Sequence, residues 1–443
     1  MTGSPNLETV STRLQRIAQL AREDPKRAFL SLAHHIDIDF LREAYRRTRK
    51  DGAPGVDGQT AAAYEENLEA NLQSLLDRFK SGRYQAPPVR RAYIPKGSDP
   101  TKKRPIGIPT FEDKVLQRAV AMVLEAVYEQ DFLDCSYGFR PERSAHQAIR
   151  KLWEVLMSLG GGWVLEADIQ SFYDDLDRSQ LRSFLDQRVR DGVIRRTLDK
   201  WLKAGVMEGG TLSHPTTGTP QGGVISPLLS NIYLHEVLDT WFEAVVKPRL
   251  QGAAFLIRFA DDFVLVFQLE SDARRMLEVL PKRFGKYGLS LHPDKTRLVR
   301  FERPGPTDGS GRTHPDEKPR SFDFLGFTHF WERSRRGRWM VKRKTASDRI
   351  TRFLRRINEW CRGNRHAPLD WQHAQLLSKL RGHSGYYGIT GNSLSLSSVH
   401  QRVKLIWRKW LSRRSREPSM PWKRFQLLLK RYTLPNLRIC VAA

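Results

Sequence analysis

Residues 255–267 read Phe-Leu-Ile-Arg-Phe-Ala-Asp-Asp-Phe-Val-Leu-Val-Phe, two apolar runs that meet at a pair of carboxylates, Asp261 and Asp262. Such runs predict two β-strands of a packed sheet that are joined at the acidic pair. A second apolar stretch, residues 162–167, is followed in the same way by Asp168. The sequence therefore predicts three carboxylates at the ends of buried strands.

Carboxylates in this setting indicate a metal site. A charged group in apolar surroundings is unfavourable unless a cation or hydrogen bonds compensate it. Mg²⁺ prefers hard oxygen ligands carried by a rigid backbone. The alternative is that Asp261 and Asp262 only form a tight turn, as acidic residues often do, but their neighbours Phe259 and Phe263 are poor turn formers.

The charge of the chain is concentrated near its C-terminal end. Residues 331–443 hold 27 Lys and Arg against 5 Asp and Glu, a net charge of +22, whereas the other 330 residues have a net charge of only +4. A block this basic repels itself unless a polyanion neutralises it. Seven of the 11 tryptophans also lie in the block, which indicates a folded domain. Of the two candidate polyanions, anionic membrane and nucleic acid, the pattern favours nucleic acid.

Several protein classes are excluded by composition. No apolar run is long enough to span a bilayer, and the first residues lack the pattern of a secretory signal. The three cysteines, Cys135, Cys361 and Cys440, have no paired spacing. They predict neither a disulfide framework nor a zinc site, which is typical of a reducing compartment.

The remaining sequence alternates helical and strand-like segments. We expect helices before residue 50 and through residues 68–76, a loop at 51–58, and a helix that starts near Ser226. Strands are predicted at 90–96, 104–109 and 322–327, and a loop at 304–318. After residue 327 the pattern predicts basic helices, with apolar stripes at 350–357 and 403–410 that face a core.

Several blocks together resemble the group II intron reverse transcriptase/maturase family. Residues 259–262, Phe-Ala-Asp-Asp, resemble the Tyr-X-Asp-Asp box of reverse transcriptases, and residues 168–173, Asp-Ile-Gln-Ser-Phe-Tyr, resemble their first metal-binding motif. Residues 217–231 resemble the template-contacting motif of the group II intron branch. Further blocks at 51–58, 106–109, 137–140 and 380–389 also match, so the likeness runs from about residue 50 to the end.

This resemblance implies an α+β fold, a right-hand polymerase with fingers, an antiparallel palm sheet and a helical thumb. It divides the chain into an N-terminal helical extension (1–50), fingers and the start of the palm (51–160), the palm (161–330), and a basic helical thumb and maturase domain (331–443). The implied function is RNA-directed DNA synthesis with two Mg²⁺ ions, or Mn²⁺ in their place. The implied partners are a group II intron RNA whose splicing is assisted, an RNA template, a DNA primer, dNTPs and target DNA, without a membrane, in a bacterial-type cytoplasm near the nucleoid.

The family motifs also imply roles for individual residues. The catalytic and metal-binding set is Asp168, Ile169, Asp261 and Asp262, with Lys295 as the group that protonates the leaving pyrophosphate. The nucleotide-binding set is Arg90, Lys96, Arg104, Phe172, Tyr173 and Gln221. The template- and primer-binding set is Gly218, Pro220, Gly222, Gly223, Phe259, Leu325 and Gly326. The RNA-binding set is Arg349, Arg352, Arg355, Arg356, Lys404 and Arg408.

Simpler interpretations stay open for several of these residues. Tyr173 is the first choice for the ring that excludes a 2′-hydroxyl and Phe172 the second, although both rings could be core packing. Lys295 could be a solvated lysine, and the nucleotide-binding cations could be ordinary surface charge. The glycines of residues 218–223 permit close approach to a ligand, but they could also form a plain loop.

Two departures from the family pattern affect the expected function. Phe259 stands where most relatives have tyrosine, so a hydroxyl near the primer terminus is missing. No cysteine pairs of a nicking endonuclease follow the basic block, so the primer is expected to come from another route. The alternatives are an intron-independent reverse transcriptase used in repair or defence, a non-catalytic RNA-binding maturase and, disfavoured by Tyr173, an RNA-dependent RNA polymerase.

Overall fold

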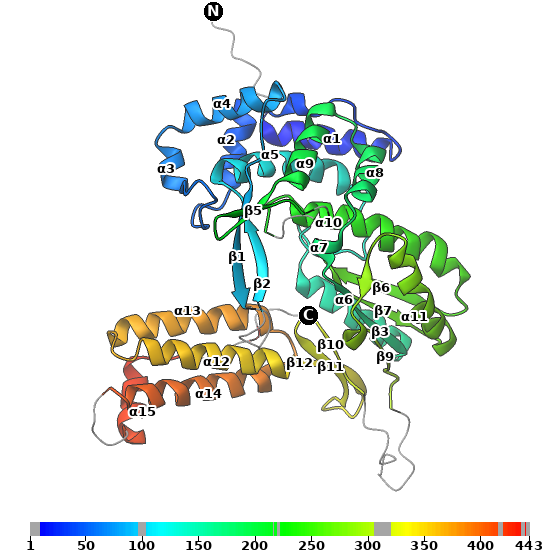
Figure 1. Ribbon diagram of the computed structural model, residues 1–443. Helices are drawn as coiled ribbons and strands as arrows, with labels where there is room; N and C mark the ends of the chain where they lie inside the picture. Colours follow the sequence, from blue (N-terminus) through cyan, green and yellow to red (C-terminus); the bar gives the residue numbers. More distant parts are fainter. Residues whose placement is uncertain are drawn as a thin grey trace, which may run out of the picture. The chain divides into compact units, whose positions relative to one another are not determined.

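The computed structural model describes residues 9–95, 103–215, 217–218, 222–304, 320–414, 420–435 and 439. These residues form two compact units (Figure 1). Among the described residues, the first unit contains those within 9–95, 103–144 and 165–298, and the second contains those within 145–164, 299–304, 320–414, 420–435 and 439. Helices and strands are mixed along the chain, so the predicted α+β class is confirmed.

The first unit begins with helices that gather around one buried helix. These are α1 (Val10–Glu23), the short helix η1 (Ala33–His35), α2 (Ile38–Arg47), α3 (Ala61–Glu65), α4 (Leu68–Lys80) and the buried helix α5 (Phe111–Tyr128). Helices α1, α2 and α3 all contact α5. The side chain of Thr110 caps α5 by accepting a hydrogen bond from the amide of Asp113, which pairs an amide that has no partner within the helix.

A four-stranded sheet, in the order β2-β1-β4-β5, extends from these helices. Strand β1 (Val89–Pro95) pairs antiparallel with β2 (Lys103–Ile108) and parallel with β4 (Val206–Glu208), which forms a hairpin with β5 (Thr211–Ser213). Helices α8 (Arg178–Arg188) and α9 (Gly192–Lys203) precede β4 in the chain. The predicted pair of strands at 90–96 and 104–109 is therefore confirmed within the described residues.

A five-stranded sheet carries the acidic residues. Its order is β6-β7-β3-β8, with β9 also paired to β3. The strands are β3 (Trp163–Gln170), β6 (Ala254–Phe259), β7 (Asp262–Phe267), β8 (Ser290–Leu291) and β9 (Arg297–Arg300). Between β3 and β6 the chain also forms α7 (Phe172–Asp175), α10 (Ser226–Leu234) and the short helices η2 (His235–Asp239), η3 (Phe242–Val246) and η4 (Lys247–Arg249). Helix α11 (Glu270–Gly285) packs on β7 and β8, and the short helix η5 (Pro293–Lys295) precedes β9.

The second unit combines a small sheet with a bundle of helices. Strands β10 (Phe322–Phe324), β11 (Phe327–Arg333) and β12 (Trp339–Thr345) form an antiparallel sheet, and α6 (Ala145–Leu159) contacts β12. The helices α12 (Ser347–Gly363), α13 (Leu369–Tyr387), α14 (Ser393–Leu411) and α15 (Trp422–Arg431) enclose an apolar core around Leu376, Leu380 and Trp407. The predicted apolar stripes at 350–357 and 403–410 face this core.

One prediction for this part of the chain was wrong. Helices were expected directly after residue 327, but residues 327–345 form β11 and β12. The expected single strand at 322–327 is a hairpin, with Leu325 and Gly326 at its turn and φ angles of 49° and 80°. In β11 buried residues alternate with partly exposed ones. The basic residues of the two strands resemble those of a basic helix when only charge is considered. The four-part division of the chain stays a prediction.

No described helix is both long and apolar enough to cross a membrane. Cys135 and Cys361 are free thiols, and Cys440 lies outside the described residues.

A buried carboxylate joins three segments of the first unit. Asp113 of α5 accepts hydrogen bonds from the hydroxyl of Tyr84, from the indole of Trp201 on α9 at 2.6 Å, and from the amide of Gln117 at 3.0 Å. Gln117 in turn accepts the backbone N–H of Val224, at 2.8 Å. The network therefore links α5 to the segment just before α10.

The Asp113 network has a pH signature. Burial raises the pKa of Asp113 to about 6, whereas an unfolded chain has about 3.9. The folded state therefore binds this proton more tightly, and the resulting stability is present below about pH 4 and is lost as the pH rises through about 6. Between pH 4 and pH 7 we expect the free energy of unfolding of wild type to fall by about 2–3 kcal/mol relative to Asp113→Asn, which does not titrate. Urea unfolding of both proteins at both pH values measures this, and parallel pH dependences would contradict it.

Candidate active site

The acidic pair lies at a tight turn between β6 and β7. Phe259 and Asp262 are the last paired residues, so Ala260 and Asp261 form the turn. Ala260 has a φ of 58°, in the left-handed region that costs a non-glycine residue about 1–2 kcal/mol. Burial, with the charge of Asp168 adding to it, raises the pKa of Asp261 above its ordinary value. Two predicted catalytic carboxylates, one on β3 and one on the turn, are thus close enough to repel each other.

Lys295 lies at the same site. Its ammonium group donates a hydrogen bond to Oδ2 of Asp168 and forms an ion pair with it. The backbone holds this contact in place, because the amide of His292 donates to the carbonyl of Asp168 at 2.8 Å and Ile169 pairs with Leu291 of β8. The structure therefore brings together the lysine and the carboxylate that the family resemblance had grouped.

The donor set fits a divalent cation in part. Asp168 and Asp261 supply hard oxygens, and the mutual repulsion of their charges is what a cation would relieve. Among the residues that the structure describes, no group of three or more His, Cys, Asp or Glu side chains is arranged to hold a metal ion. The fit therefore rests on two carboxylates from different strands, and Asp262 begins β7 directly beside them.

The two candidate sugar-gate rings have different surroundings. Phe172 is only 3% exposed and packs edge-on against Tyr233 of α10. Tyr173 is partly exposed, and its pKa is raised by burial while the nearby charge of Arg104 lowers it. Tyr173 thus lies near Arg104 and Asp261, whereas Phe172 belongs to the core. Ser171, with a φ of 45°, gives the chain its sharp bend between β3 and these rings.

The cations predicted to bind the nucleotide lie on or near the β1–β2 hairpin. Arg104 is exposed, pairs with Ile94 across the hairpin, and its charge lowers the pKa of Asp261. Arg90 has a structural contact, because its guanidinium donates to the carbonyl of Pro54 at 2.8 and 3.0 Å. Lys96 lies outside the described residues.

The glycine-rich motif is packed tightly between two elements. A Cβ on Gly218 would lie 2.6 Å from the carbonyl oxygen of Tyr173, and one on Gly222 would lie 2.7 Å from that of Gly107 on β2. Both glycines also have positive φ angles, 78° and 115°. Residues larger than glycine are therefore excluded at both positions, by the close backbone contacts and by the positive φ angles. Gly223 is buried, and Pro220 and Gln221 lie outside the described residues.

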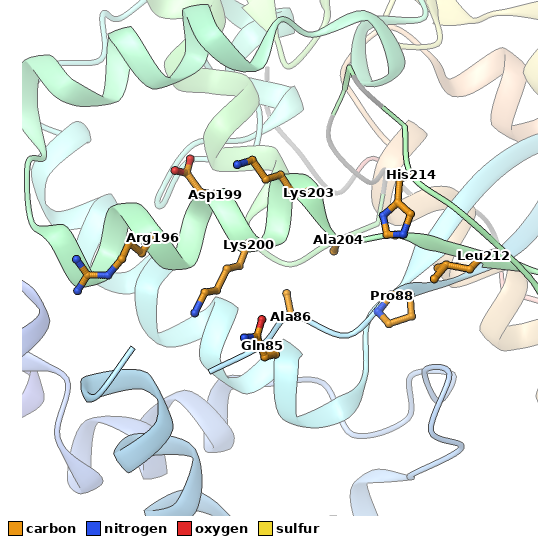
Figure 2. A pocket seen from close by; sticks show the side chains of 11 residues that line it. Gln85, Ala86, Pro88, Arg196, Asp199, Lys200, Lys203, Ala204, Leu212 and His214 are labelled. Carbon is orange, nitrogen blue, oxygen red and sulfur yellow. The ribbon is translucent and has the colours of Figure 1, made fainter. Parts of the chain in front are cut away.

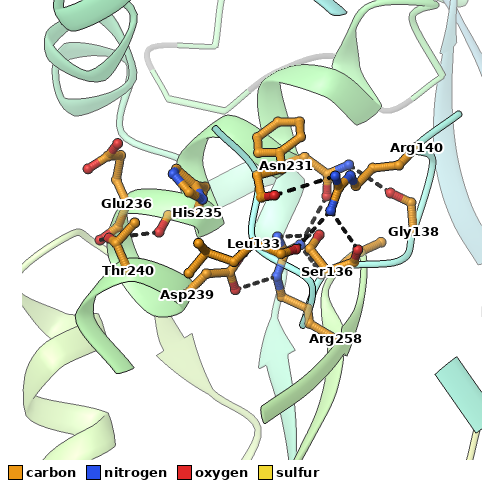
Figure 3. A network of polar contacts seen from close by, with 12 residues as sticks. Leu133, Ser136, Gly138, Arg140, Asn231, His235, Glu236, Asp239, Thr240 and Arg258 are labelled. Carbon is orange, nitrogen blue, oxygen red and sulfur yellow. Dashed lines mark hydrogen bonds and ion pairs between the residues drawn. The ribbon is translucent and has the colours of Figure 1, made fainter. Parts of the chain in front are cut away.

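Sequence reasoning missed the buried polar network behind the acidic turn (Figure 3). Arg258 of β6 is completely buried and forms an ion pair with Asp239, at 2.6 Å. Its guanidinium also donates to Asn231 at 3.0 Å, to the hydroxyl of Ser136 at 2.8 Å and to the carbonyl of Ala260 at 3.0 Å. The available signal was a lone arginine within an otherwise apolar strand.

The segment at residues 136–140 is fastened to the same turn. The amide of Asn231 donates to the carbonyl of Gly138 at 2.7 Å, and the amide of Tyr137 donates to the carbonyl of Arg258 at 2.8 Å. A Cβ on Gly138 would lie 2.3 Å from the backbone nitrogen of Ala260. Position 138 of the family block at 137–140 therefore requires glycine, because the backbone there touches the backbone of the acidic turn.

The remaining predicted residues belong to the second unit. The hydroxyl of Tyr386 donates to the carbonyl of Leu325 at 2.8 Å, and the hydroxyl of Tyr387 lies 3.0 Å from the position of a Cβ on Gly326. The hairpin turn is therefore attached to the end of α13, within the family block at 380–389.

The predicted RNA-binding residues differ in how exposed they are. Arg356 is exposed, as is Arg349, whose side chain is 43% accessible, whereas Arg352 is 20% accessible and pairs with Asp348 at 3.1 Å. Arg355 and Lys404 are partly exposed. Arg408 has a structural contact, because it donates to the carbonyl of Met420 at 2.8 Å and packs on Trp422.

A pocket of about 470 Å³ lies elsewhere in the first unit, along α9 and the β4–β5 hairpin. Figure 2 shows Lys200 pointing toward Gln85, with His214 and Leu212 at the other end. Lys200 donates to the carbonyls of Gly82 and Tyr84 at 2.7 and 2.5 Å, so it ties α9 to the segment after α4. None of the predicted site residues lines this pocket.

Comparison with known proteins identifies the family of the chain. The family model described as reverse transcriptase (RNA-dependent DNA polymerase) matches residues 94–329. Protein YkfC of Escherichia coli strain K12 is 35% identical over 384 residues, which cover 78% of this chain and 94% of that protein. The group II intron-encoded protein LtrA of Lactococcus lactis subsp. cremoris is 38% identical over 228 residues, 51% of this chain and 37% of LtrA. The mitochondrial nuclear intron maturase 2 of Arabidopsis thaliana is 30% identical over 41% of this chain and 31% of its own length.

The family model covers more than half of the chain, and the alignment with YkfC covers nearly all of that relative. The two intron-encoded or maturase relatives match this chain over about a third of their own length. The chain belongs to the reverse transcriptase family, in its group II intron reverse transcriptase and maturase branch.

Proposed function

We propose that this chain is an RNA-directed DNA polymerase that binds a group II intron RNA, assists its splicing and copies it into DNA. The polymerase proposal rests on one observation. Asp168 and Asp261 lie close together, Lys295 forms an ion pair with Asp168, and the charge of Arg104 acts on Asp261. Carboxylates for a divalent cation, a proton donor and a cation for a triphosphate are the groups that nucleotidyl transfer requires. The proposed fold is the right-hand polymerase, with the five-stranded sheet as palm, the β1–β2 hairpin as part of the fingers and α12–α14 as thumb.

The carboxylates of Asp168, Asp261 and Asp262, with the backbone carbonyl of Ile169, would hold Mg²⁺, or Mn²⁺ in its place. Such ions neutralise charge on the phosphates and activate the primer 3′-hydroxyl when they are bound. Lys295 carries the proton on Nζ that the leaving pyrophosphate needs. Arg104 draws the triphosphate toward the carboxylates, and Lys96 and Gln221 complete the nucleotide site.

Tyr173 is proposed to discriminate against ribonucleotides. Its ring is partly exposed, and the charges of Asp261 and Arg104 are close enough to shift the pKa of its hydroxyl. A ring at this place would occupy the volume of a 2′-hydroxyl. Residues 218–223 and Phe259 of the first unit, and separately the Leu325–Gly326 turn of the second unit, are proposed to bind template or primer. The basic helices are proposed to bind the intron RNA. Target DNA as a further partner, and action in the cytoplasm near the nucleoid, belong to the same proposal.

Asp261→Ala tests the catalytic assignment. Removal of a metal ligand should lower primer extension on an RNA template with dNTPs and Mg²⁺ by roughly three decades or more, which is about 4 kcal/mol of transition-state stabilisation. Asp77→Ala is the matched control, because Asp77 is an exposed aspartate on α4. Full activity of Asp261→Ala would remove the assignment. The wild-type protein could instead bind RNA and assist splicing but never extend a primer. That result would favour the non-catalytic maturase.

Tyr173→Ala and Phe172→Ala should behave differently. Loss of the Tyr173 ring should raise the incorporation of ribonucleotides relative to deoxyribonucleotides, measured as a ratio of kcat/KM values. Phe172→Ala removes a buried ring and should lower the free energy of unfolding by about 3–5 kcal/mol. If the nucleotide ratio changes only in Phe172→Ala, the two assignments must be exchanged.

The maturase role is tested by RNA affinity near physiological salt, where non-specific binding weakens to about micromolar or worse. The cognate intron should stay bound while an unstructured RNA of equal length dissociates. Arg355→Gln with Arg356→Gln should lower the salt slope of intron binding by about 1 for each lost phosphate contact. Arg352→Gln is the comparison, because Arg352 is mostly covered and paired with Asp348. Equal affinity for intron and scrambled RNA would favour the intron-independent reverse transcriptase.

A further inference from the structure

An aromatic side chain beside the acidic turn is exposed in a strained conformation. Phe139 is 57% exposed and has a φ of 57°. Positive φ is a genuine outlier for a bulky residue, and exposure means that core packing does not compensate for it. Strained residues of this kind concentrate where a ligand is held.

The residues on either side of Phe139 impose its conformation, and both of them, Gly138 and Arg140, belong to the polar network of Figure 3. Gly138 is fixed against the backbone of Ala260 and by the hydrogen bond from Asn231. Arg140 is 8% exposed, and its guanidinium donates to the carbonyls of Leu133 and Ser136 at 2.8 and 2.9 Å. Both neighbours are therefore anchored in the network behind the turn, and Phe139 is presented outward by a rigid backbone.

A second aromatic ring lies next to Phe139. The ring centroids of Phe139 and Phe259 are 6.2 Å apart, with planes inclined by 43°. Phe259 is the last residue of β6, pairs with Asp262 and precedes the turn residues Ala260 and Asp261. The two rings thus form an apolar surface immediately beside the carboxylates. Neither ring carries a hydrogen-bond donor or acceptor, so this surface cannot read base identity.

We propose that Phe139, supported by Phe259, stacks on the last base pair of the template–primer duplex. The inference rests on the proposed polymerase function and names the group that holds the duplex end next to the acids. Aromatic stacking suits this position because every base has a π-face, and stacking is therefore tolerant of sequence. A polymerase meets a new terminal base pair after each addition, so a contact that ignores base identity is required there.

The test measures binding of a primer–template duplex without dNTPs, with the fluorescent base 2-aminopurine at the primer 3′ end. Phe139→Ala and Phe139→Leu should each raise the Kd by about 10-fold, within the range of base–aromatic stacking, and should leave the fluorescence brighter than wild type does. Phe139→Tyr should stay within about 2-fold of wild type. Leu30→Ala, which removes another exposed apolar side chain of the first unit, is the matched control and should change nothing.

A purely structural role predicts a different pattern. Phe139→Gly relieves the positive φ, so its melting temperature should equal or exceed that of wild type while its duplex affinity falls as in Phe139→Ala. Wild-type affinity and quenching in Phe139→Leu, or a lower melting temperature of Phe139→Gly, would overturn the proposal. A wild type that binds and quenches the probe but never extends the primer would instead remove the polymerase function and leave the stacking result standing.

Discussion

The geometry of the acidic turn depends on one buried guanidinium. Arg258 has no exposed surface, and its donors reach Ser136 in one segment, Asn231 and Asp239 in the consecutive helices α10 and η2, and the carbonyl of Ala260. Burying such a pair has a desolvation cost that its attraction only offsets when every donor is satisfied, and removal of one partner typically costs about 3–5 kcal/mol. The effect of this arrangement is to fix the position of the backbone at the acidic turn. The carbonyl held by Arg258 belongs to the residue directly before Asp261.

Strain around this turn is maintained by the network. Ala260, Phe139 and Ser171 all have positive φ angles without being glycine, at a cost of about 1–2 kcal/mol each. Two of them, Ala260 and Phe139, are in or beside segments that Arg258, Asn231 and Gly138 hold together. A flexible loop would relax out of such conformations, so the network is the reason that they persist. The carboxylates are consequently carried by a backbone that has few alternative conformations.

Much of this site could be predicted from the sequence because its signals are local. Apolar runs next to acids indicated β3, β6 and β7, and the family resemblance placed Lys295 in the same catalytic set as Asp168. Arg258 was not found, because a single arginine in a strand can equally face solvent, and its partner Asp239 is 19 residues away in the chain. The choice between Phe172 and Tyr173 depended on which ring meets Tyr233, a contact between distant segments. The strands at 327–345 could not be predicted from charge, because their basic residues resemble those of the helices that follow, and only the alternation of buried and partly exposed residues distinguishes them.

Net charge also overstates how much of the basic block is available to a polyanion. Arg408 is engaged with the carbonyl of Met420, Arg414 donates to the carbonyls of Arg365 and Ala367, and Arg352 is mostly covered. Guanidinium groups with such contacts stabilise loops between helices and have fewer donors left for phosphate. Electrostatic attraction at long range depends on the sum of all charges, whereas short-range phosphate contacts depend on accessible donors. A net charge of +22 in residues 331–443 therefore accounts for attraction to nucleic acid in general. Under the proposed maturase function, selection of one folded RNA would have to come from the smaller set of arginines whose side chains remain accessible, and from the shape of the helices that carry them.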